Sequence, residues 1–278
     1  MKLPPLSYLR PLTIEDALSA WSSSAGDTMF LAGGQGLLSE MAQGLRRPAT
    51  LIDVSAIPEF RTIKPVPDAS VIRIGSAVRL TELSAHPELA GSLLAAAARH
   101  VAVAPVRTLA TVGGNFGHGH PTSELPLAAL VAGAALTGLR QDGSAVRVTG
   151  DELSKLRPAA DRSELLITAL EWPTHRNGHV AGFTEVGEQR SWIPAAAIGW
   201  LADHAPDPDR GAAHARVGVA VRGGARFVIS QPEGAVGCSA ESVEQAAAAA
   251  GVRPTLPCSW LADLISDLLS PGLHPERA

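Results

Sequence analysis

Residues 111–126 read TVGGNFGHGHPTSELP, and the rest of the chain is interpreted around this stretch. Two adjacent glycines, Gly113 and Gly114, follow the β-branched pair Thr111-Val112. This order predicts a strand that runs into a turn where the backbone comes very close to another group. Such a turn exposes successive backbone N–H groups, which bind phosphate oxygens without any basic side chain. The stretch is therefore a candidate phosphate-binding loop.

A second glycine-rich stretch, AGGQGL at 32–37, directly follows the apolar, strand-like run Met29–Leu31. Two such loops in one domain suit a pyrophosphate held between them. Neither has the G-x-G-x-x-G spacing of a Rossmann fingerprint, because the third glycine of the first loop would fall on Ser39. A lone glycine pair is also compatible with an ordinary tight turn, so the wider pattern has to decide.

Several further motifs accompany the two loops in a fixed order. They are Tyr8-Leu9-Arg10-Pro11, Glu15-Asp16-Ala17-Leu18, Arg47-Pro48, Leu51-Ile52-Asp53 and Ile74-Gly75-Ser76-Ala77. Together with the loops they resemble the FAD-binding (medium) subunit of the molybdenum hydroxylases, a family that includes the carbon monoxide dehydrogenase flavoprotein and the flavin domain of xanthine dehydrogenase. The resemblance runs collinearly over roughly residues 6–140.

The resemblance implies a mixed α+β fold and a bound FAD. We expect a two-lobed FAD-binding domain of the PCMH/VAO type at residues 1–174, with lobes at about 1–64 and 65–174, and a small α+β domain at 180–278. Some related flavin folds attach the flavin covalently to a histidine in the first loop. Gln35 stands at that place here and cannot form the bond, so we expect non-covalent FAD.

The resemblance also implies which residues hold the cofactor. The backbone amides of Ala32, Gly33, Gly34, Gln35, Gly36 and Leu37 are assigned to the pyrophosphate, and Thr111, Gly113, Gly114 and Asn115 to the same phosphates and the ribityl chain. Glu124 stands where the family usually carries an aspartate that makes polar contacts with the cofactor. The alternative for Glu124 is a solvated carboxylate at a helix N-terminus.

His118 and His120 are the candidate catalytic residues, although the residues alone assign no catalytic group. His118 matches a histidine often seen in the family's loop, and either imidazole near a flavin could donate a hydrogen bond or relay a proton. His118, His120 and Glu124 also form an H-x-H pattern with a carboxylate. That spacing without a further ligand does not define a metal site, and none is predicted.

Composition narrows the class of protein. The 278 residues are 46% hydrophobic, with 18% charged residues and a net charge of −4, so nucleic acid is not expected as a partner. The longest apolar stretch, 125–139, is interrupted by Pro126 and Gly133, so we expect no membrane span. Cys238 and Cys258 lack metal-site spacing and are too few for a disulfide framework, which suits a cytoplasmic protein.

Hydrophobic periodicity and turn residues predict the helices and strands, with Thr13 as the N-cap of the first helix and a turn at Gln141-Asp142-Gly143. We expect helices at 13–21, 36–44, 86–100, 126–132, 241–250 and 260–269, and strands at 28–32, 50–54, 70–75, 134–139, 145–149, 165–172, 195–201, 216–221 and 226–230. Pro65 to Pro67 is interpreted as the linker between the two lobes, and Pro105 as the end of an apolar run.

The resemblance implies an oxidoreductase in which FAD receives electrons from an iron–sulfur partner and passes them to NAD or another acceptor. Molybdopterin and iron–sulfur subunits are then the expected partners, because this chain has no four-cysteine cluster motif. One alternative is a stand-alone flavin oxidase or dehydrogenase that acts on a small organic substrate. Another is a non-catalytic flavin carrier or scaffold subunit.

Overall fold

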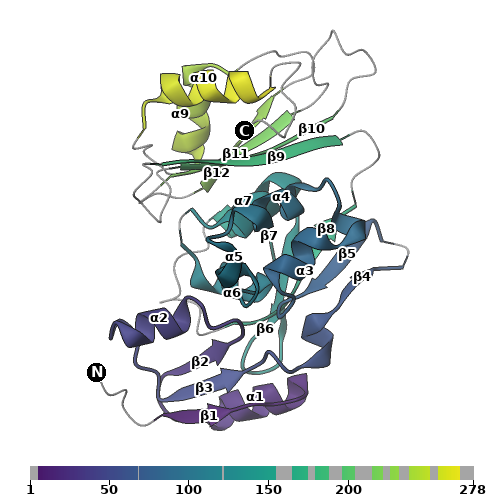
Figure 1. The fold of residues 1–278 in the computed structure, drawn as a ribbon, viewed down its shortest axis with the longest axis vertical. Coiled ribbons are helices and arrows are strands. Elements are labelled where there is room, and N and C mark those ends of the chain that lie inside the picture. Colours follow the sequence, from purple (N-terminus) through teal and green to yellow (C-terminus); the bar gives the residue numbers. More distant parts are fainter. Residues whose placement is uncertain are drawn as a thin grey trace.

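The structure is a computed structural model. It describes residues 6–67, 69–120, 122–154, 165–174, 179–187, 196–203, 215–221, 226–231, 238–250 and 256–269. Along its long axis the molecule has an N-terminal lobe, a middle lobe and a C-terminal sheet with its helices (Figure 1). The expected mixture of helix and strand is confirmed.

The N-terminal lobe is a parallel sheet in the order β1-β3-β2. Its elements are β1 (Ser7–Leu9), α1 (Ile14–Ser23), β2 (Thr28–Leu31), α2 (Leu37–Ala42) and β3 (Thr50–Asp53). Thr13 caps α1 as predicted, since its hydroxyl oxygen accepts a hydrogen bond from the Asp16 amide at 3.1 Å. Ala17 and Trp21 bury the apolar stripe of α1 against Ile52 of β3. The loop at 32–36 therefore lies at the carboxyl end of an edge strand that is paired with β3.

The middle lobe is an antiparallel sheet in the order β4-β5-β8-β6-β7. Its strands are β4 (Ile63–Pro65), β5 (Val71–Gly75), β6 (Ala135–Leu139), β7 (Ala145–Thr149) and β8 (Leu166–Pro173). The helical segments of this part of the chain are η1 (Pro58–Arg61), α3 (Leu80–Ala85), η2 (Pro87–Leu89), α4 (Leu93–His100), α5 (Ala104–Arg107), α6 (Val112–His118), α7 (Glu124–Ala132) and α8 (Gly150–Ser154). Every residue of α7 from Leu125 to Ala132 is buried, as a helix apolar on all sides requires.

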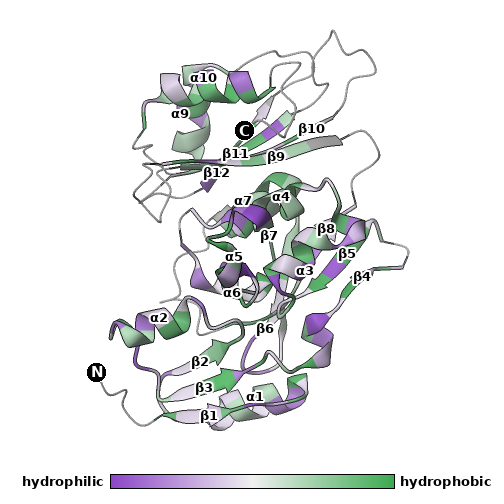
Figure 2. Ribbon diagram, viewed as in Figure 1, coloured by the Kyte–Doolittle hydropathy of each residue, from purple (hydrophilic) through white to green (hydrophobic). Residues whose placement is uncertain are grey.

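The C-terminal part is an antiparallel sheet in the order β12-β11-β10-β9, followed by two helices. Its elements are β9 (His179–Val186), β10 (Ala196–Asp203), β11 (Ala215–Val221), β12 (Arg226–Gln231), α9 (Ala240–Ala249) and α10 (Cys258–Leu269). Because side chains alternate along each strand, Ala197 and Ala220 join the core around α4 and α7, while Ile198 packs with α9 and α10. Figure 2 shows both apolar layers.

Residues 112–118 are helical, so the predicted strand and turn are wrong. Thr111 is the N-cap of α6, and its hydroxyl oxygen accepts a hydrogen bond from the Gly114 amide at 3.2 Å. The β-branched pair and the glycines suggested the end of a strand. A threonine whose hydroxyl oxygen accepts the amide three residues later is, however, a common N-cap of a helix. The helix ends at Gly119, whose φ of +63° is left-handed.

Three other expectations are corrected. The helix predicted at 86–100 is divided into η2 and α4, because Gly91 has a φ of +72° and Ser92 caps a new helix. Pro65–Pro67 is no linker between lobes: Pro65 pairs with Ile72, and the Val66 amide donates to the Val71 carbonyl in a β4–β5 turn. Pro105 lies in the first turn of α5 instead of ending a run. Residues 175–178, where the domain boundary was expected, and 270–278 lie outside the described residues.

Candidate functional site

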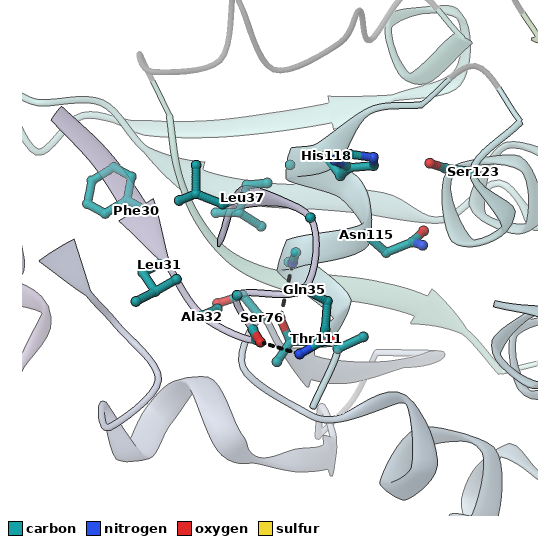
Figure 3. A pocket seen from close by; sticks show the side chains of 18 of the residues that line it. Phe30, Leu31, Ala32, Gln35, Leu37, Ser76, Thr111, Asn115, His118 and Ser123 are labelled. Carbon is teal, nitrogen blue, oxygen red and sulfur yellow. Dashed lines mark hydrogen bonds between the residues drawn. The ribbon is translucent and has the colours of Figure 1, made fainter. Parts of the chain in front are cut away.

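A cavity of about 630 Å³ lies where the two lobes meet. It is lined by the β2–α2 loop on one side and by α6 with the start of α7 on the other (Figure 3). All of the predicted cofactor residues, and both candidate histidines, line it: Ala32, Gly33, Gly34, Gln35, Gly36, Leu37, Thr111, Gly113, Gly114, Asn115, His118, His120 and Glu124. The two stretches, about eighty residues apart in sequence, therefore form one site.

The first loop presents unused backbone donors to this cavity. Among the described residues, no acceptor is found for the amides from Gly33 to Leu37. Gly34 has a φ of +71°, which a glycine adopts without strain. Gly33 lies so close to the Leu109 carbonyl that any side chain would clash with that backbone. A run of free amides at a fixed turn is the arrangement that binds an anion.

The second stretch has a different role from the predicted one. Its amides are occupied: Gly113 donates to the Ser76 carbonyl at 2.7 Å, and Gly114 donates to the Thr111 hydroxyl oxygen. Gly113 is required for packing, because a Cβ there would lie 2.7 Å from the Ser76 Cβ. A Cβ at Gly114 would meet, among the described atoms outside its own helix backbone, only the Thr111 hydroxyl oxygen at 2.9 Å. Gly114 therefore leaves room in the cavity instead of supplying a donor.

Ser76 supplies a further polar group. It is 3% exposed and lines the cavity, yet its hydroxyl has no hydrogen-bond partner among the described residues. A buried hydroxyl without a partner costs folding free energy unless a ligand satisfies it. Ser76 belonged to the motif 74–77 but was not assigned to the site. Ser123 at the start of α7, 5% exposed, also lines the cavity without having been predicted.

His118 joins the two sides of the cavity. Its ring lies over Gly36, where a Cβ would come within 2.7 Å of Nδ1, and that nitrogen is 3.7 Å from a carboxylate oxygen of Glu40 on α2. The His120 ring centre is 6.4 Å from that of His118, and its Nδ1 is 2.9 Å from the Thr122 hydroxyl. Among the described residues, no group of three or more His, Cys, Asp or Glu side chains is placed to hold a metal ion.

Glu124 is not the solvated carboxylate of the alternative interpretation. It lines the cavity, and its carboxylate accepts a hydrogen bond from the Asn115 side-chain amide at 3.2 Å. The Asn115 oxygen in turn accepts from the Leu125 amide at 3.3 Å, so Asn115 is held on the N-terminus of α7. Burial raises the pKa of Glu124, while the hydrogen bond from Asn115 and the charge of Arg226 lower it.

Most of the remaining wall of the cavity is apolar, with Arg140 as a charged exception, and it was not predicted. It comes from the 101–110 segment and from β6, β7 and β8: Val101, Ala102, Val106, Ala110, Leu136, Val146, Leu165, Leu166 and Ile167. These residues carry no sequence motif, because an apolar wall and an apolar core have the same composition. A cavity with free amides at one side and aliphatic walls elsewhere suits a ligand that joins a pyrophosphate to flat ring systems.

The fold and the site together define a two-lobed flavin-binding domain followed by an α+β domain. The chain belongs to the family described as the FAD binding domain in molybdopterin dehydrogenase, whose model matches residues 4–175. The cofactor of this family is FAD, and the free amides, the unpaired Ser76 hydroxyl and the space at Gly114 fit it.

Relatives support this membership. The chain is 37% identical over 141 residues to the nicotine 6-hydroxylase medium subunit of Paenarthrobacter nicotinovorans, covering 50% of this chain and 47% of that protein. It is 32% identical to a putative xanthine dehydrogenase FAD-binding subunit of Escherichia coli, covering 70% and 67%. The chain thus spans about half the length of the first curated relatives it matches.

A solved structure shares the fold over nearly the whole chain. Carbon monoxide dehydrogenase from Hydrogenophaga pseudoflava aligns with a TM-score of 0.72, covering 97% of this chain and 94% of that one, at 22% identity. The resemblance stated from the sequence is therefore confirmed, both for the family and for the fold. Separately, no helix among the described residues is long and apolar enough to cross a bilayer.

Proposed function

We propose that this chain is the FAD-carrying subunit of a molybdenum hydroxylase-type dehydrogenase. The observation that carries the proposal is the run of unpartnered amides from Gly33 to Leu37 facing a cavity of about 630 Å³, in a chain of the FAD-binding family. Several relatives are named as medium chains or FAD-binding subunits of dehydrogenases. We therefore infer molybdopterin and iron–sulfur subunits as partners.

The residues would divide the work of holding the cofactor. Amides 33–37 bind the pyrophosphate oxygens, the Ser76 hydroxyl adds a hydrogen bond, and Gly114 keeps the approach free. The aliphatic wall from β6 and β8 excludes water from the ring systems. Bound FAD supplies the redox chemistry, accepting and passing on electrons. The protein's part is orientation and electrostatics, including the Glu124 carboxyl beside the cavity.

NAD or another acceptor is proposed to take the electrons from FAD, and a small organic molecule is proposed as the substrate of the whole assembly. The reverse reaction tests the acceptor: NADH added anaerobically to the yellow holoprotein bleaches the flavin absorbance near the visible maximum if NAD binds productively. An unchanged spectrum, with dithionite still bleaching the same sample, contradicts NAD.

Assembly separates the proposal from the stand-alone alternatives. The tagged chain is purified from its own cells, and the eluate is analysed for iron, molybdenum and co-purifying chains. The proposal predicts two further subunits with both metals in fixed ratio to FAD. A flavin-only protein that oxidises a small substrate by itself would support the stand-alone enzyme, and one with neither partner nor turnover would support the carrier.

A further inference from the structure

A row of four residues crosses the C-terminal sheet on the face that packs against α7. Glu185 of β9 pairs with Ala197 of β10, Ala197 pairs with Ala220 of β11, and Ala220 pairs with Arg226 of β12. Two alanines therefore separate the carboxylate from the guanidinium. With strands about 4.8 Å apart, the ends of the row lie roughly 14 Å from each other.

The N-terminal end of α7 lies over this row. Ala197 and Ala220 are fully buried in the core that also contains α7. Glu124, the first residue of α7, interacts electrostatically with both ends of the row. The charge of Arg226 lowers the pKa of Glu124, and the charge of Glu124 raises the pKa of Glu185. The cavity carboxyl is thus flanked by one positive and one acidic group from the other domain.

Arg226 also binds the chain that leads into α7. It is 2% exposed, and its Nη2 donates to the His120 carbonyl at 2.5 Å, across 106 residues of sequence. The same carbonyl accepts the Ser123 amide at 2.9 Å. A buried guanidinium holds a carbonyl firmly, because leaving either group unpaired would be costly. Arg226 therefore fixes His120 and, through the shared carbonyl, Ser123 at the start of α7; both line the cavity, as does Glu124.

We propose that Arg226 is a positioning residue for the FAD site, by which the C-terminal sheet holds His120 and residues 122–124 against the cavity, and that Glu185 sets the pH at which FAD binding weakens. The inference rests on the proposed function, since it concerns the cofactor site. Glu185 and Arg226 were not among the residues expected to matter for FAD.

Charge balance gives the direction of the pH effect. Burial and the charge of Glu124 raise the pKa of Glu185 to about 7. His100 of α4 packs against Phe183 on the same face, but burial lowers its pKa and keeps it neutral at this pH. Below pH 7 Glu185 is protonated and adds no negative charge beside Glu124 and Arg226. Above pH 7 a second carboxylate is added beside a site that binds an anion, and FAD binding weakens.

Arg216 provides a matched control. It lies on β11 and its Nη2 donates to the Leu130 carbonyl at 3.2 Å, near the other end of α7. At 1.5 Å per residue, this contact is roughly 9 Å further along the helix from Glu124. Arg216→Gln removes an arginine-to-carbonyl hydrogen bond between the same sheet and the α7 region, but from β11 to the interior of α7, away from the residues that line the cavity.

The experiment measures FAD affinity of the full chain by flavin fluorescence quenching from pH 6 to 8.5, with circular dichroism as the check on folding. Arg226→Gln is expected to weaken FAD binding about tenfold or more, within the range usual for coupling between two sites. Arg226→Lys keeps the charge without the planar fork and recovers part of the loss. Arg216→Gln leaves the affinity unchanged. A folded Arg226→Gln protein with wild-type affinity overturns the positioning role.

Glu185→Gln tests the second part and removes a buried charge, so it is also decisive if Arg226→Gln does not fold. His118 and His120 line the cavity in both proteins, so a difference between the pH profiles of FAD affinity of the variant and the wild type is due to Glu185. The wild type should lose affinity through pH 7 by several-fold more than Glu185→Gln. Identical pH profiles overturn the proposal. A wild-type chain that binds no FAD contradicts the proposed function itself, whereas FAD binding insensitive to both variants contradicts only this inference.

Discussion

Gly114→Val separates loss of the cofactor from loss of the fold. Gly114 lines the cavity from the first turn of α6, and its amide already donates to the Thr111 hydroxyl oxygen. A valine would place three carbon atoms in space that the chain leaves open, with the new Cβ 2.9 Å from that hydroxyl. The substitution therefore blocks the approach of FAD while leaving the amides of the first loop in place.

The expected magnitudes differ for binding and stability. If the pyrophosphate is displaced from only two amides of 33–37, at roughly 1.5–3 kcal/mol for each charge-assisted bond, affinity falls by about two to four orders of magnitude. Stability changes little, because valine is a better helix former than glycine by a few tenths of a kcal/mol. Displacing the Thr111 cap costs about 1 kcal/mol in the opposite direction.

The assay is FAD titration of the apoprotein, with thermal unfolding measured on the same preparation. Gly91→Val serves as the control: Gly91 has a φ of +72° and open space around its Cβ position, so the variant is strained but remote from the cavity. It should unfold at a lower temperature and keep its FAD. A folded Gly114→Val protein that purifies with full FAD occupancy refutes the placement of FAD against α6.

Three further predictions follow from single groups. Ser76→Ala should stabilise the apoprotein by about 1 kcal/mol, because an unpaired buried hydroxyl is removed, yet weaken FAD binding several-fold; denaturant unfolding of the apoprotein and FAD titration check both signs. Gln35 cannot bond the flavin, so acid precipitation should release all colour into the supernatant, and a yellow pellet would point to His118 or His120. The pKa of Glu185 is raised from 4.5 to about 7, so the folded state holds this proton more tightly than the unfolded state. The free energy of unfolding should therefore fall as pH rises across that window, by about 1–2 kcal/mol once partial exposure is allowed for. A denaturant series from pH 4.5 to 8 should show this loss in the wild type and its absence in Glu185→Gln.

Much of the fold was predictable because its signals are local. The cap at Thr13, the turn around Gly143 and the strands 134–139 and 145–149 were expected within a residue or two, since each depends on hydrophobic period and turn chemistry. The helix at 112–118 was missed because its three glycines are unfavourable in a helix, and its stability comes from the Thr111 cap and tertiary contacts. The strand β9 was also missed, because Phe183 and its neighbours are recognised as a strand only from their pairing with β10.

The residues assigned to the cofactor line one cavity, and their assignment to FAD stays a prediction. Sequence placed both loops at one site, and the cavity between them agrees. It could not tell that Gly113 is required by packing on Ser76 while Gly114 leaves open space, since both are glycines in one motif. Glu185 and Arg226 carry no motif at all. Their relation to Glu124 arises from strand register across the sheet, which no single segment encodes.

The identity of the released cofactor tests the central claim most directly. The holoprotein is denatured in acid and the supernatant is separated by chromatography against FAD and FMN standards. A site built from the free amides of 33–37 for a pyrophosphate predicts FAD in near-equimolar amount. FMN alone, or a protein that takes up neither flavin when FAD is added to the folded chain, would contradict the cofactor site described above.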